Sequence, residues 1–189
     1  MYSMVFSITA SKQSPRDIKG QSTSLKPFDR TSLIMFTITF VLACFMFFSQ
    51  LGSMPIFSPD EALYAEPARE MLEINEYVTT YLNYQVRYTK PPLFIWAIAA
   101  SIKVFGVTEF ACRFASAAAG AILVGITYLF AEKFFGRRQA FLAALSLMVA
   151  PLFLTVSRLA ITDTPLSLFV ACSLFSLFYG FTTGENRWK

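Results

Sequence analysis

The chain has 189 residues, of which 55% are hydrophobic and 15% are charged, whereas a soluble domain carries about 25% charged residues. The formal net charge is +4, and the basic residues are dispersed at segment ends rather than clustered, which excludes a nucleic-acid-binding surface. Histidine is absent, so imidazole catalysis and histidine-ligated metals are excluded, and any catalysis has to rest on carboxylates, lysine, arginine, tyrosine or hydroxyl groups.

The first 31 residues are polar and carry five basic residues: Lys12, Arg16, Lys19, Lys26 and Arg30. We expect residues 1–31 to form a disordered cytoplasmic tail. The apolar run 32–51 is as long as a transmembrane helix, which needs about 20 apolar residues. It has no convincing small-x-small cleavage pattern, which favours a membrane helix over a cleaved signal peptide. Because basic residues precede this helix and acidic residues follow it, the positive-inside rule places its N-terminus in the cytoplasm.

A short segment after this helix holds half of the acidic residues, since six of the twelve lie between Asp60 and Glu76. Ser58 can cap a helix that has Pro59 at its first position, and Glu61 stands three residues after Ser58, which makes a capping box. Carboxylates in a first helical turn also suit the helix dipole. Taken alone, Asp60 and Glu61 are therefore explained about equally well by helix capping and by catalysis.

Farther along the same helix, the spacing of Glu66, Arg69 and Glu73 predicts ion pairs on a solvated face. Pro67 is expected to interrupt or kink the helix, because it lacks the N–H that would bond to the preceding turn. We expect this helix to be a juxtamembrane element of an outer loop that covers residues 52–109.

Lys90 ends the polar part of that outer loop, directly before Pro91 and Pro92. The two prolines fix the backbone direction, which favours a positioned cation over a lysine that only anchors the membrane edge. The apolar segment 92–107 is short for a span of ~20 residues and contains Lys103, so we expect an amphipathic or partly inserted helix there.

Three further apolar segments complete the membrane domain: 110–130, 140–156 and 165–181. Four spans in total satisfy the positive-inside rule, because Arg137 then lies inside and Asp163 faces outward. A fifth span over 92–107 would reverse both placements. Small residues over 115–121 predict close helix packing and no further function. The expected fold class is all-α: a polytopic membrane helix bundle of about four transmembrane helices over residues 32–189, with juxtamembrane helices in its outer loop.

Two charged residues, Arg158 and Asp163, stand at the outer end of the third span in this topology. A salt-bridged or interface-anchoring pair would account for them, but ionisable groups at a membrane edge are by default functional candidates. Together with Asp60 and Lys90 they place two carboxylates and two cations on one membrane face. Such a set could accommodate a lipid phosphate and an acceptor.

Three motifs follow one another: Ser-Pro-Asp-Glu-Ala-Leu-Tyr-Ala-Glu-Pro-Ala-Arg-Glu-Met-Leu over 58–72, Lys-Pro-Pro-Leu over 90–93, and Arg-Leu-Ala-Ile-Thr-Asp-Thr-Pro-Leu over 158–166. As an ordered set they resemble the N-terminal part of the GT-C membrane glycosyltransferases. The most similar group is the bacterial one related to protein O-mannosyltransferases and to aminoarabinose transferases that act on lipid A. The chain departs from the aminoarabinose transferases at Leu63, where they tend to have arginine, and at Thr89, where they tend to have an acidic residue.

The resemblance implies an inverting transfer of a sugar from a polyprenyl-phosphate-linked donor to a lipid, glycan or protein acceptor, at the non-cytoplasmic face of the plasma (inner) membrane. It implies that Asp60 is the principal catalytic carboxylate, with Glu61 in support. Asp163 would complete the acidic pocket, and Lys90 would neutralise the donor phosphate as the glycosidic bond breaks. We add Arg158 as a second phosphate contact. No metal ligand and no cofactor is predicted, and a divalent metal ion stays an open alternative.

Members of that group are much longer than this chain, so we expect a fragment, a split gene or a truncation, with a separate C-terminal half as a partner. The competing hypothesis is a non-catalytic membrane subunit, or a lipid-binding assembly partner, that keeps the front half of the fold. The expected partners are membrane lipids, a polyprenyl-phosphate sugar and an acceptor of unknown kind, and no nucleic acid.

Overall fold

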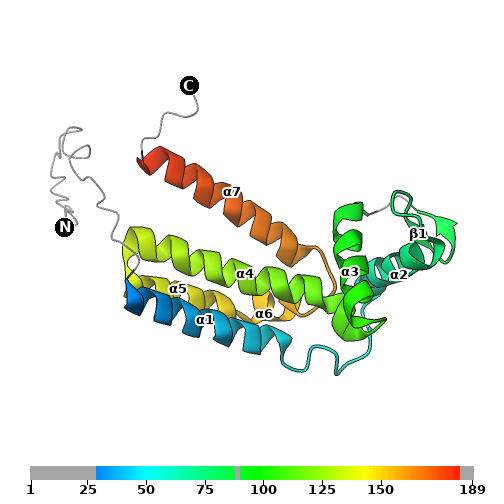
Figure 1. Cartoon of the computed structure of the whole chain (residues 1–189), viewed down its shortest axis with the longest axis horizontal. Helices are drawn as coiled ribbons and strands as arrows, with labels where there is room; N and C mark the ends of the chain where they lie inside the picture. Colours follow the sequence, from blue (N-terminus) through cyan, green and yellow to red (C-terminus); the bar gives the residue numbers. More distant parts are fainter. Residues whose placement is uncertain (1–28, 88–89, 184–189) are drawn as a thin grey trace, which may run out of the picture.

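The chain forms a bundle of long helices with a smaller unit at one end (Figure 1). The computed structural model describes residues 29–87 and 90–183. Of the predicted cytoplasmic tail, residues 1–31, the part up to residue 28 lies outside the described residues, and Arg30 already begins the first helix.

In the described part of the chain, five helices build the bundle: α1 (Arg30–Phe48), α4 (Glu109–Phe135), α5 (Arg137–Val149), α6 (Pro151–Ser157) and α7 (Asp163–Thr183). Three of them, α1, α4 and α7, are long and apolar enough to cross a membrane. Helices α5 and α6 pass the same test only together, as one span that is bent by 66°. The described residues therefore contain three or, with the bent pair, four candidate spans, in agreement with the prediction.

The predicted third span, 140–156, is not one continuous helix. It is divided where Ala150, in an extended conformation, precedes Pro151, the first residue of α6. Proline cannot donate the hydrogen bond that would continue α5, and it disfavours a helical conformation in the residue before it. The sequence contained this signal in Pro151, but the span over 140–156 was predicted without the break.

Helix α4 is the centre of the bundle and packs against α1, α5, α6 and α7. Its stretch of small residues serves close packing, as predicted, and Ala117 and Gly120 are buried. A Cβ atom on Gly120 would lie 2.9 Å from Ser157 Oγ at the end of α6 and 3.5 Å from the Phe47 ring of α1. Gly120 therefore lets two neighbouring elements approach the α4 backbone.

The smaller unit is the predicted outer loop, and it consists of α2 (Pro59–Ile74), β1 (Tyr81–Leu82), β2 (Gln85–Val86) and α3 (Pro92–Phe105). The two strands form an antiparallel hairpin that the sequence did not predict. Helix α3 has 14 residues and lies beside α2 at the end of the bundle rather than among the long helices (Figure 1). Helix α3 is shorter than a span of about 20 residues, and its interfacial position stays a prediction.

Helix α2 is continuous through Pro67, so the predicted interruption does not occur. The predicted ion pairs do form: Arg69 Nε donates to Glu66 Oε2 at 3.1 Å, and Arg69 also bonds to Glu73. The hydrogen bond from Arg69 holds the pKa of the Glu66 carboxyl below its usual range. These pairs occupy a partly exposed face of α2 and leave its first turn to other contacts.

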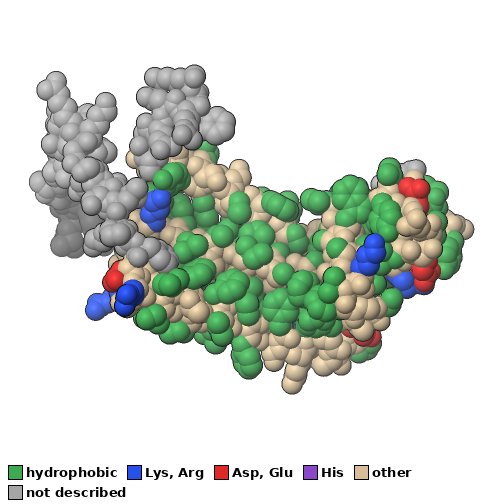
Figure 2. All heavy atoms as spheres, viewed as in Figure 1, with side chains coloured by type: hydrophobic (Ala, Val, Ile, Leu, Met, Phe, Trp, Pro, Cys, Tyr) green, Lys and Arg blue, Asp and Glu red, His purple; other side chains and the backbone are tan. Residues whose placement is uncertain are grey.

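On the face that Figure 2 shows, charged side chains lie toward the two ends of the molecule, and many hydrophobic side chains cover the surface between them. At the end where α1 begins, Arg137 Nη2 donates to Ser32 Oγ at 3.0 Å. Helices α2 and α7 begin at the opposite end (Figure 1). The basic residues of the α4–α5 turn and the acidic outer loop therefore lie at opposite ends of the bundle, which is the arrangement that four spans require.

Candidate active site

Asp60 is the second residue of α2, and its side chain is exposed. Ser58 is the N-cap residue and Pro59 takes the first helical position, as predicted. The predicted capping box is not formed, because the Ser58 side chain makes no capping hydrogen bond and the Glu61 carboxylate turns to other partners. Within residues 29–87 and 90–183, no ion pair or hydrogen bond engages the Asp60 carboxylate, so it is available to a substrate.

Glu61, in contrast, is fully buried. Its carboxylate forms a bidentate ion pair with Arg113 of α4, with 2.8 Å from Arg113 Nε to Oε1 and 3.0 Å from Nη2 to Oε2. The backbone N–H of Ala160 donates a further bond to Oε1 at 2.9 Å. Both oxygens are therefore satisfied by the protein itself, and this side chain can position its neighbours but is not open to a substrate.

The other hydrogen bonds of the Arg113 guanidinium go to the segment between α1 and α2. Its Nη1 donates to the carbonyl oxygens of Leu51 at 3.1 Å and Met54 at 2.8 Å, and its Nη2 donates to that of Pro55 at 3.1 Å. The Arg113 side chain is only 4% exposed. Together with its carboxylate partner, this guanidinium joins the segments that lead into α2 and α7 to the first turns of α4.

Lys90 and Thr162, the residue before Asp163, contact Tyr64 in the first turns of α2 from distant parts of the chain. Lys90 Nζ lies 4.8 Å from the centroid of the Tyr64 ring, which is within the range of a cation–π interaction. The Tyr64 hydroxyl lies 3.2 Å from Thr162 Oγ1, and Thr162 immediately precedes Asp163, the exposed first residue of α7. Tyr64, which lies one helical turn after Asp60 on α2, therefore links Lys90 to the start of α7.

Arg158 belongs to the segment between α6 and α7, but it is not paired with Asp163 in the described structure. Its Nη1 and Nη2 donate to the carbonyl oxygens of Met46 at 3.1 Å and Ser49 at 2.6 Å, at the end of α1. These carbonyl groups have no partner within the helix, and a cation is also favourable at the negative end of the helix dipole. The structure thus gives Arg158 a capping contact, and its predicted phosphate contact stays a prediction.

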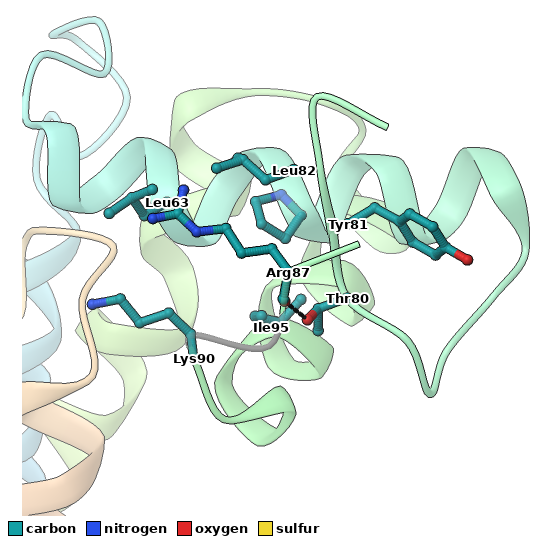
Figure 3. Close-up of a pocket in the computed structure, with 8 residues that line it drawn as sticks. Leu63, Thr80, Tyr81, Leu82, Arg87, Lys90 and Ile95 are labelled. Atoms are coloured by element: carbon teal, nitrogen blue, oxygen red, sulfur yellow. Dashed lines mark hydrogen bonds between the residues drawn. The ribbon is translucent and has the colours of Figure 1, made fainter. Parts of the chain in front are cut away.

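The β1–β2 hairpin, α2 and α3 surround a small pocket (Figure 3). It is lined by Leu63, Pro67, Thr80, Tyr81, Leu82, Arg87, Lys90 and Ile95. The backbone N–H of Arg87 donates to the Thr80 carbonyl at 2.9 Å, and the Thr80 hydroxyl donates to the Arg87 carbonyl. The buried Glu70 of α2 accepts a bond from the Tyr84 N–H at 3.1 Å, which fastens the hairpin turn to α2.

The sequence did not reveal three residues that build this site: Tyr64, Arg87 and Arg113. Arg113 carried a usable signal, because an arginine inside an apolar span of small residues requires a partner. Tyr64 and Arg87 carried none, since their importance comes from contacts between segments that are distant along the chain. Within the described residues, no group of three or more Cys, Asp or Glu side chains could hold a metal ion.

Comparison with known proteins finds relatives that are much longer than this chain. Residues 89–189 match the family model described as dolichyl-phosphate-mannose-protein mannosyltransferase. An uncharacterized protein of Aquifex aeolicus (strain VF5) is 31% identical over 153 residues, which cover 80% of this chain and 30% of that protein. The undecaprenyl phosphate-alpha-4-amino-4-deoxy-L-arabinose arabinosyl transferase of Aeromonas hydrophila is 31% identical over 135 residues, which cover 71% of this chain and 25% of the transferase.

A solved structure shares the fold. The crystal structure of ArnT from Cupriavidus metallidurans bound to undecaprenyl phosphate aligns with a TM-score of 0.69 and 28% identity, over 78% of this chain and 27% of that chain. The chain thus spans between a quarter and a third of the length of these relatives. Its architecture is that of a GT-C membrane glycosyltransferase. Because the family model matches more than half of its residues, the chain belongs to the dolichyl-phosphate-mannose-protein mannosyltransferase family.

Proposed function

We propose that this chain takes part in the transfer of a sugar from a polyprenyl-phosphate-linked donor to a lipid, glycan or protein acceptor, at the non-cytoplasmic face of the plasma membrane. The observation that carries the proposal is the approach of Lys90 and the start of α7 to Tyr64, one turn from the exposed Asp60. A lipid-linked donor is supported by two relatives: one is named as an undecaprenyl phosphate-aminoarabinose transferase, and the other was solved with undecaprenyl phosphate.

The proposed reaction is a single displacement at the anomeric carbon of the donor sugar. The acceptor hydroxyl oxygen forms the new bond to this carbon, while the bond from the carbon to the bridging phosphate oxygen breaks and leaves its electron pair on the phosphate. Asp60 accepts the proton of the acceptor hydroxyl, as a general base. One displacement inverts the configuration, and the phosphate gains one negative charge as it leaves.

The other residues support this step in different ways. Lys90 places a positive charge where negative charge develops, which stabilises the transition state. Asp163, exposed at the start of α7, orients the acceptor or the sugar beside Asp60. Glu61 is a positioning residue, because its buried ion pair fixes the turn that carries Asp60. Arg158 uses two of the five N–H donors of a guanidinium on α1, and the remaining donors are its proposed means of contacting a phosphate.

The test replaces Asp60 with asparagine, which keeps the shape of the side chain and removes the base. Cells that carry the variant at the native locus provide membranes, in which transfer from an undecaprenyl-phosphate-linked sugar is measured. We expect a loss of at least about 100-fold, the usual minimum for removal of a general base. The matched control is Glu109→Gln, because Glu109 is also an acidic residue in a first helical turn at the same end of the bundle.

The outcomes separate the two functional hypotheses. Loss with Asp60→Asn but not with Glu109→Gln supports catalysis by Asp60 and excludes a mere effect of charge at a helix start. Undiminished transfer in the Asp60→Asn membranes, combined with loss of transfer when the whole chain is deleted, would overturn the catalytic proposal. That second result would support a non-catalytic membrane subunit that assists a separate C-terminal half.

A further inference from the structure

We infer that Arg87 is a second phosphate-binding residue, and that Arg87 and Lys90 together form a two-cation clamp for the leaving polyprenyl phosphate. This inference rests on the proposed function of Lys90. It adds to that function a second cation, from the hairpin, and a preference for the product phosphate over the donor.

The first support is the shared pocket. Arg87 and Lys90 both line it, together with Leu63, which stands one turn beyond Asp60 on α2. The charged ends of the two side chains extend toward the same side of this pocket (Figure 3). Two cations at one small pocket repel each other, so an anion bound between them is strongly favoured.

The second support is the lack of competing partners. Arg69, Arg113 and Arg137 each form an ion pair with a carboxylate. In contrast, no carboxylate in residues 29–87 or 90–183 pairs with Arg87 or Lys90. Lys90 rests against an aromatic ring, which holds its ammonium group in place without neutralising its charge. The pocket therefore keeps two positive charges for a ligand.

The third support is the way the backbone of Arg87 is held. Two hydrogen bonds connect Arg87 to Thr80, one in each direction, at the base of the hairpin. The hairpin turn is bound in addition to the buried Glu70 of α2. The exposed guanidinium thus extends from a fixed point. A guanidinium on a fixed backbone suits phosphate, because its planar fork can donate two parallel hydrogen bonds to two oxygens.

The chemistry of the proposed reaction explains why two cations are useful. A sugar joined to a polyprenyl phosphate is a phosphodiester with one negative charge. When the bond to the anomeric carbon breaks, the bridging oxygen keeps the electron pair and the phosphate becomes a monoester with two negative charges. A pair of cations matches the charge of the leaving group, so Arg87 contributes more to the transition state and the product than to the donor.

The test measures binding of two probes to the full 189-residue chain in lipid nanodiscs. The probes are undecaprenyl phosphate, a dianion at about pH 8 because its second pKa is near 6, and its methyl ester, which stays a monoanion. For Arg87→Gln we expect the Kd of undecaprenyl phosphate to rise about tenfold, or about 1.4 kcal/mol, and that of the methyl ester to rise much less. Arg87→Lys should recover part of the affinity, and Lys103→Gln, on the exposed end of α3, should change neither Kd.

Each outcome bears on one of the two proposals. If Lys90→Gln weakens binding while Arg87→Gln does not, the clamp is overturned and the function of Lys90 stands. If Arg87→Gln weakens both probes equally, the preference for the leaving phosphate is wrong. If neither variant changes the Kd of undecaprenyl phosphate, the phosphate site proposed for Lys90 is itself wrong. Thermal unfolding of each variant checks that the fold is kept, and the exposure of Arg87 makes this the expected result.

Discussion

Asp60 and Glu61 are adjacent carboxylates with opposite surroundings. Successive residues of a helix point about 100° apart, because one turn takes 3.6 residues. Asp60 is therefore exposed while Glu61 is fully buried against α4. A sequence pattern treats the two as a pair, but only Asp60 can reach a substrate. These surroundings fit the proposed chemical role for Asp60 and a positioning role for Glu61.

The buried pair of Glu61 and Arg113 predicts a large effect on stability. Glu61→Ala leaves the guanidinium buried without its carboxylate, and breaking such a pair costs about 3–5 kcal/mol. The control Glu66→Ala removes a partly exposed partner of Arg69 and should cost less than about 1 kcal/mol. Denaturant unfolding in detergent micelles measures both free energies of unfolding. Equal losses of unfolding free energy in the two variants would show that the buried pair stabilises the fold no more than the exposed one does.

The helices were predictable from the sequence to different degrees, for physical reasons. Apolar runs of span length identify α1, α4 and α7, because their signal lies within each segment. The hairpin has only two residues in each strand, too few for an alternating pattern to stand out. Sequence motifs singled out Asp60 and Lys90 for the site, and their functional roles stay predictions. The place of Arg87 in the pocket was not predictable, because it depends on how the hairpin folds onto α2.

The packing of α4 against α6 and α1 gives a prediction for Gly120. In Gly120→Ala the new methyl group would lie 3.0 Å from Ser157 Cβ, so the α6 end has to move, at a cost of about 1–3 kcal/mol. Gly180→Ala in α7 is the matched control, because no atom lies within 4 Å of its added methyl group. We expect a lower unfolding temperature only for the first variant. An unchanged unfolding temperature for Gly120→Ala would contradict the close approach.

The distribution of charge over the molecule agrees with one orientation in the membrane. Basic residues lie where α1 begins and where α4 turns into α5, and the acidic outer loop lies at the opposite end. Because basic segments stay in the cytoplasm, we propose that α2, the hairpin and α3 face outward. The apolar flanks of the bundle between these ends fit a lipid surrounding (Figure 2).

This orientation can be tested by labelling single cysteines in a variant that lacks Cys44, Cys112 and Cys172. A cysteine at Asp163 should react with a membrane-impermeant maleimide in intact cells or spheroplasts. A cysteine at Gln139, exposed near the start of α5, should react only after permeabilisation. The reverse pattern of labelling would contradict the proposed orientation, and equal labelling of both sites in sealed cells would contradict the four-span arrangement.

The bonds of Arg113 have a consequence for the order in which this protein assembles. Its guanidinium binds Glu61 and three carbonyl oxygens from the segment between α1 and α2. An arginine without these partners is costly to bury, so α4 cannot settle fully into the bundle before that segment has folded around it. We therefore expect a chain whose outer loop is disordered to leave this guanidinium without its partners at the outer end of α4.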